Sequence, residues 1–160
     1  MPTKQAAKSR KPVRKSENLW TDEERAAAQA AVQERQAASR RTSSDERADG
    51  LQELRASIAK MPADDRAMAK RIHEIVSAAV PALVAKTYYG MPAYATEGKN
   101  GKVICFFKPK SKFKVRYSTF GFQPDARLDE GDMWPTEFAV TALTSAVEKR
   151  IADLARKGAG

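Results

Sequence analysis

The residues best suited to chemistry in this sequence are cations interleaved with aromatic side chains between positions 102 and 120. If Lys102–Lys108 and Lys112–Phe120 are strands joined across Pro109, their side chains alternate between two faces. Pairing Phe107 with Phe113 gives one apolar face, made of Val103, Cys105, Phe107, Phe113, Val115 and Tyr117. The other face then presents Phe106 among four cations, Lys108, Lys112, Lys114 and Arg116. Cations around an aromatic ring suit phosphate binding or base stacking. The alternative is an ordinary solvated face, because lysine-rich outer faces are common in half-buried sheets.

The most distinctive string in the chain precedes this region and reads Tyr89-Gly90-Met91-Pro92-Ala93-Tyr94. Gly90 can adopt a positive φ, and Pro92 forces Met91 into an extended conformation. The string therefore predicts a turn between two short strands, Lys86–Tyr89 and Ala93–Thr96. If this turn folds against the basic face, its tyrosines can form an apolar wall beside a bound anion. The predicted ligand-binding residues are Tyr89, Gly90, Met91, Pro92, Tyr94, Phe106, Lys108, Lys112, Lys114 and Arg116.

Other chemistry-bearing residues do not combine into a catalytic or metal site. His73 is the sole histidine and has no further ligands at helical spacing, whereas zinc sites use several Cys or His. Cys105 lies within an apolar string and is expected to be a small buried side chain. The acidic loop at 121–132 lacks the spacing of a calcium loop, although its carboxylates could bind a hard cation; these are Asp125, Asp129, Glu130 and Asp132. We therefore predict no catalytic residue, no metal site, no cofactor and no enzyme.

The spacing of apolar residues predicts the helices and strands that position these side chains. Residues 51–60 and 64–79 read as two helices that form a hairpin over a sheet. A last helix is capped near Thr144 or Ser145, and a further short strand is expected within 133–140. Together with the strands above, this pattern predicts an α+β domain over residues 50–158, a small, mainly antiparallel sheet packed by helices.

The first fifty residues have a different character. Residues 1–18 carry six Lys or Arg against one Glu and little apolar surface, which predicts a disordered basic tail. Residues 19–49 comprise an Ala-rich helix and a linker. Thr21 and Glu24 have capping-box spacing at the helix start. The helix then runs to about Ser39 with almost no apolar stripe, so we expect it to be exposed and loosely docked.

The charge and composition of the chain indicate which classes of partner and which location to expect. The net charge of +9 favours anionic partners such as phosphate metabolites, acidic protein surfaces or nucleic acid. The single cysteine excludes an internal disulfide and suits a reducing compartment. No stretch approaches the roughly 18 apolar residues of a membrane span, and no secretory signal is evident. We therefore expect a cytoplasmic protein that does not enter a membrane.

From Leu51 to Lys157 the sequence resembles the YdhG-like family, small α+β domains of unknown function. The resemblance rests on the Tyr89–Tyr94 string, on the two strands and basic segment that follow, and on the C-terminal helix. Phe113–Tyr117 and Met133–Thr136 are similar to the form with an added N-terminal helix. The resemblance implies a compact sheet packed by helices, with a frataxin-like fold in some members. Those members are linked to iron delivery through acidic surface residues, and no matching acidic ridge is evident here.

Three functions follow as hypotheses. The first is a non-catalytic YdhG-like domain that binds a small anionic ligand or an acidic partner. The second is an intracellular iron chaperone of frataxin-like type, using the acidic loop at 121–132. The third is weak, non-specific nucleic-acid binding through the basic tail.

Overall fold

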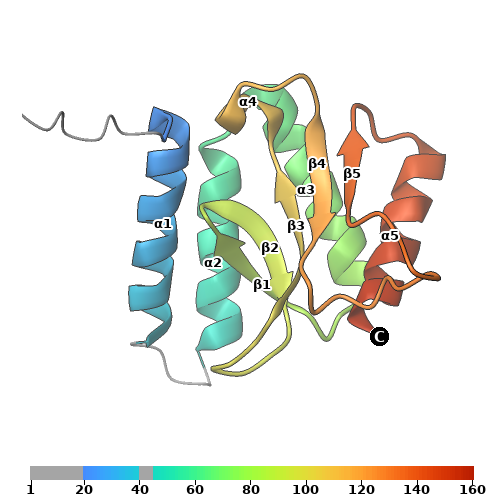
Figure 1. Ribbon diagram of the computed structural model, residues 1–160. Coiled ribbons are helices and arrows are strands. Elements are labelled where there is room, and N and C mark those ends of the chain that lie inside the picture. The colour runs from blue at the N-terminus through green and yellow to red at the C-terminus, as the bar shows by residue number, and fades with distance from the viewer. Residues whose placement is uncertain (1–19, 40–44) are drawn as a thin grey trace, which may run out of the picture.

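The computed structural model describes residues 20–39 and 45–160, which form a five-stranded sheet packed by helices (Figure 1). The strands pair in chain order, each antiparallel to the next: β1 (Val84–Tyr88), β2 (Met91–Ala95), β3 (Val103–Lys108), β4 (Ser118–Phe122) and β5 (Glu137–Val140). The helices are α1 (Asp22–Ser39), α2 (Glu46–Ala59), α3 (Ala63–Ala79), α4 (Lys110–Phe113) and α5 (Ser145–Ala159). The predicted α+β fold with an antiparallel sheet is confirmed. The predicted tail, residues 1–18, lies outside the described residues, as does 40–44 of the linker.

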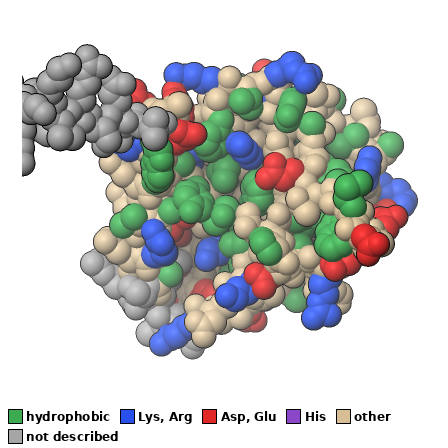
Figure 2. Space-filling model, in the orientation of Figure 1, with side chains coloured by type: hydrophobic (Ala, Val, Ile, Leu, Met, Phe, Trp, Pro, Cys, Tyr) green, Lys and Arg blue, Asp and Glu red, His purple; other side chains and the backbone are tan. Residues whose placement is uncertain are grey.

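The main core lies between one face of the sheet and the helices α2, α3 and α5. Helical spacing places Leu54, Ile72 and Ile151 on faces that meet Phe107 and Phe120 of the sheet. The opposite face carries a second, smaller cluster of Met91, Ala93 and Phe106, bordered by Tyr88, Val103 and Phe113. In the view of Figure 1, α3 lies behind the sheet and α5 lies to the right of β5. Figure 2 shows hydrophobic side chains gathered over β2 and β3 on the near face.

The predicted strand over Lys112–Phe120 is wrong, and with it the pairing of Phe107 with Phe113. Pro109 instead begins the short helix α4, which ends where Lys114 turns into the left-handed region at φ 53°. β4 starts only at Ser118, whose hydroxyl accepts a hydrogen bond from the Lys110 N–H at 3.0 Å. Phe107 therefore pairs with Phe120, and Cys105 pairs with Phe122. The string from Ser118 to Phe122 also alternates, and its two phenylalanines, Phe120 and Phe122, both belong to the main core.

Most helix ends agree with the sequence. The capping box of α1 is present, because the Thr21 N–H donates to Glu24 at 2.8 Å and the Glu24 N–H donates to Thr21 at 3.1 Å. Thr144 caps α5, since its hydroxyl accepts from the Val147 N–H at 3.3 Å. α2 begins at Glu46, earlier than expected. None of the helices in 20–39 or 45–160 is long and apolar enough to cross a membrane.

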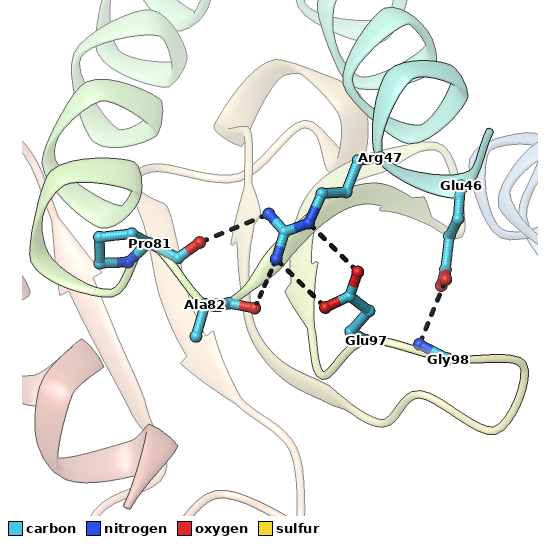
Figure 3. Close-up of polar contacts among 6 residues, drawn as sticks. All are labelled: Glu46, Arg47, Pro81, Ala82, Glu97 and Gly98. Atoms are coloured by element: carbon cyan, nitrogen blue, oxygen red, sulfur yellow. Dashed lines mark hydrogen bonds and ion pairs between the residues drawn. The ribbon is translucent and has the colours of Figure 1, made fainter. Parts of the chain in front are cut away.

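The start of α2 is fastened to two loops by Arg47 (Figure 3). Its guanidinium donates to the carbonyls of Pro81 and Ala82 at 3.4 and 3.1 Å, and to the Glu97 carboxylate at 3.3 Å. One residue earlier, the Glu46 carboxylate accepts from the Gly98 N–H at 3.2 Å. These bonds join α2 to the α3–β1 connection and to the β2–β3 loop.

Candidate functional site

A carboxylate is held at the turn between β1 and β2. The Tyr89 N–H donates to one oxygen of Glu34 at 3.0 Å, and the Gly90 N–H donates to the other at 2.7 Å. Glu34 belongs to α1, more than fifty residues earlier in the chain. The turn has two residues, at φ 51° and 76°, a conformation that matches the twist of an antiparallel hairpin. The predicted positive φ of Gly90 is confirmed.

Lys112 supplies the positive charge of this corner. Its ammonium donates to the Tyr89 carbonyl, so α4 is tied to the back of the same turn. Burial lowers the pKa of Lys112, and the negative charge of Glu34 acts in the opposite sense. We call the group formed by Tyr89, Gly90 and Lys112 the Gly90 corner. Two amide donors thus bind a single carboxylate, and the Lys112 ammonium acts on that carboxylate through its charge.

An ion pair joins α1 to the end of α4. Lys114 contacts the Glu23 carboxylate, and this contact lowers the pKa of Glu23 and raises the pKa of Lys114. Within the described residues, Tyr89 and Lys114 are the two non-glycine residues with positive φ. Each such residue carries a backbone cost of about 1–2 kcal/mol. Strained backbone of this kind is often found at functional sites, and here both examples contact α1.

A groove of about 610 Å³ opens beside the Gly90 corner, between α1, α2 and α4. Ala30 and Ala37 line it on α1, and Met61 lines it across from them. Asp65 also lines it and is only 2% exposed, and its carboxylate accepts from the Ser111 N–H at 3.1 Å. This carboxylate fixes α4 against the start of α3, and so it positions Lys112.

The structure brings together three of the ten predicted ligand-binding residues, Tyr89, Gly90 and Lys112, whereas Lys114 pairs with Glu23 near the other end of α1. The expected single face is divided by α4. Lys108 lies over the Phe113 ring at 4.6 Å and Arg116 over the Tyr117 ring at 5.1 Å, rather than beside the turn. Met91 and Phe106 belong to the second cluster, on the near face of the sheet.

Pro92 and Tyr94 lie in the interior, so the expected tyrosine wall beside the turn is wrong for Tyr94. The ring of Tyr94 instead stacks on His73, with 5.9 Å between centroids, and its hydroxyl lies 3.3 Å from His73 Nδ1. Burial, and secondarily the charge of Arg55, lowers the pKa of His73. Cys105 is buried as expected, and burial raises the pKa of its thiol to about 12.

No group of three or more His, Cys, Asp or Glu suited to a metal ion occurs in the part of the chain that the structure describes. In the acidic loop, Glu130 lies 3.7 Å from the ammonium of Lys157. The iron-chaperone hypothesis therefore gains no supporting contact.

Sequence reasoning missed Glu23, Glu34 and Asp65. The signal for the first two was present in α1, where Glu23, Ala27, Ala31 and Glu34 fall on one helical face. Ala27 and Ala31 are 5% and 8% exposed, and the other described side chains of α1 are more exposed. α1 thus docks through a narrow face of small residues between two acids that both contact the domain.

No family model, curated protein or solved structure matches this chain. The resemblance to the YdhG-like family therefore stays a prediction, and the candidate site rests on its geometry.

Proposed function

We propose that this protein is a non-catalytic binding domain for a carboxylate-bearing anionic ligand or an acidic partner segment, and that the Gly90 corner is its binding site. The observation that carries the proposal is the pair of hydrogen bonds from the Tyr89 and Gly90 N–H groups to the two oxygens of one carboxylate. The Glu34 carboxylate, which belongs to the chain itself, is the kind of group that we propose the Gly90 corner binds.

The corner has the features expected of an anion site. Successive backbone N–H groups in a left-handed turn form a concave donor surface that suits anions. Lys112 adds a partly buried cation, and charge–charge attraction is screened less there than at an open surface. Hydrogen bonds to a charged group contribute about 1.5–3 kcal/mol, roughly twice a neutral bond. The net charge of +9 also favours the approach of anions.

Within residues 20–39 and 45–160, the iron-chaperone hypothesis has no contact of this kind. The nucleic-acid hypothesis depends on residues 1–18, which lie outside the described residues. The cytoplasmic location and the frataxin-like relationship stay predictions.

The proposal is tested with the full chain carrying Glu34→Ala, which vacates the corner while keeping a good helix former in α1. Succinate is added at low salt, and the backbone amide signals of Tyr89 and Gly90 are followed by NMR. We expect saturable shifts at both amides, and a further Lys112→Met change should weaken the binding. Glu23→Ala is the matched control, because it removes the acid of α1 that contacts Lys114 and leaves Glu34 in place. Shifts that are equal in both single variants, or absent from Glu34→Ala, would refute the proposal.

A further inference from the structure

The surface that α1 covers has two charged ends. Glu23 contacts Lys114 at one end, and Glu34 contacts the Gly90 corner at the other. The two acids are eleven residues apart, which is about 16 Å or three helical turns. Lys114 and the amides of the Gly90 corner are therefore spaced to receive two carboxylates from one face of a helix.

Between these ends the surface requires small residues. Ala27 and Ala31 are buried against the domain. A Cβ placed on Gly90 would lie 3.4 Å from the Ala30 Cβ, so the helix backbone passes very close to the turn. A larger side chain at the position of Ala30 would push the helix away from the amides that bind Glu34. A helix that docks here must therefore carry a small residue four positions before its glutamate.

α1 does not fill the surface on its α2 side. The groove of about 610 Å³ has Ala30, Gln33 and Ala37 along α1, with Ala56 and Met61 across from them. An alanine at position 37 leaves apolar surface of this groove uncovered. A larger apolar side chain there would bury that surface, and the gain is about 0.8 kcal/mol for each methylene buried.

We infer that this surface is the docking site for an acidic helix of a partner protein, and that α1 is a resident occupant which the partner displaces. The inference rests on the proposed function and names its partner. The partner helix carries a small residue at the place of Ala30, glutamates at the places of Glu23 and Glu34, and a larger apolar residue at the place of Ala37. Displacement of α1 breaks the contacts of Glu23 and Glu34 and exposes Ala27 and Ala31, and the glutamates and small residues of the partner helix restore the same contacts.

The test uses fluorescein-labelled helical peptides and the full chain, with binding followed by fluorescence anisotropy. The first peptide has the sequence of residues 21–39, the second adds Ala37→Leu, and the third carries Glu34→Ala in addition to Ala37→Leu. We expect the second peptide to bind the Glu34→Ala chain about tenfold more tightly than the first. The third peptide should bind at least tenfold more weakly than the second. The unmodified chain should bind the second peptide more weakly than the Glu34→Ala chain does, because its own α1 competes.

Equal binding of the second and third peptides, or no gain from Ala37→Leu, would overturn the inference. If succinate binds the Glu34→Ala chain and no peptide does, the inference fails and the proposed function stands. If neither binds, both fail. A concentration-dependent dimer of the unmodified chain that Glu34→Ala abolishes would assign the surface to α1 of a second copy, and this too would overturn the partner assignment.

Discussion

Replacement of Gly90 by alanine perturbs the Gly90 corner at its tightest point. Gly90 has φ 76°, a conformation that costs an L-residue about 1–2 kcal/mol. The added Cβ would lie 2.5 Å from the Lys112 ammonium, so Lys112 must move. Its hydrogen bond to the Tyr89 carbonyl is then lost, at roughly 0.5–1.5 kcal/mol. We expect Gly90→Ala to lower the free energy of unfolding by about 1.5–3.5 kcal/mol.

Gly131→Ala is the matched control, since Gly131 also has a positive φ, 64°, and no atom lies within 4 Å of its added Cβ. It should show the backbone cost alone, about 1–2 kcal/mol, so Gly90→Ala should be more destabilising than Gly131→Ala by the roughly 0.5–1.5 kcal/mol of the lost hydrogen bond. Urea denaturation of both variants at pH 7.5 measures the difference. If Gly90→Ala destabilises the protein no more than Gly131→Ala does, Lys112 is not held against the turn, and the geometry of the corner is refuted.

Three further predictions concern residues around the site. Asp65→Ala leaves the Ser111 N–H without its buried acceptor and should cost roughly 1–3 kcal/mol in urea denaturation; Asp65→Asn keeps an oxygen, so an equal loss in both variants would contradict this role. Because the folded state lowers the pKa of His73, stability should be complete above pH about 6.5 and fall as the pH drops below that value; His73→Gln should remove this loss between pH 7 and 5.5, and an unchanged profile would refute the assignment. Arg47→Ala should speed amide hydrogen exchange in the first turn of α2 and at Gly98, whereas unchanged exchange would show that Arg47 does not fasten α2.

Much of the fold could be predicted because local signals agree with the tertiary structure. The spacing of Thr21 and Glu24 predicts the start of α1, and the glycine of the β1–β2 turn predicts a positive φ; the structure confirms both. The failure at α4 has a physical cause. Residues 112–120 alternate in sequence, yet a proline at a helix start and the Ser118 hydroxyl on the Lys110 N–H favour one helical turn. Alternation alone does not distinguish these outcomes.

The candidate site could be predicted only in part. The sequence pointed to the turn and to Lys112, because a glycine-containing turn and a cation-rich segment are local features. The occupant was missed because Glu34 stands more than fifty residues before the turn, in a helix with several acids. Which acid faces the domain depends on how α1 docks, and that docking is a tertiary contact made mostly by alanines.

The measurement that tests the central claim most directly is a crystal structure of the full chain carrying Glu34→Ala, grown with succinate. We predict that one succinate carboxylate lies within hydrogen-bond distance of the Tyr89 and Gly90 nitrogens, with the Lys112 ammonium beside it. A structure in which the corner holds no succinate, while its turn keeps the same conformation, would contradict the claim that the Gly90 corner is a carboxylate-binding site.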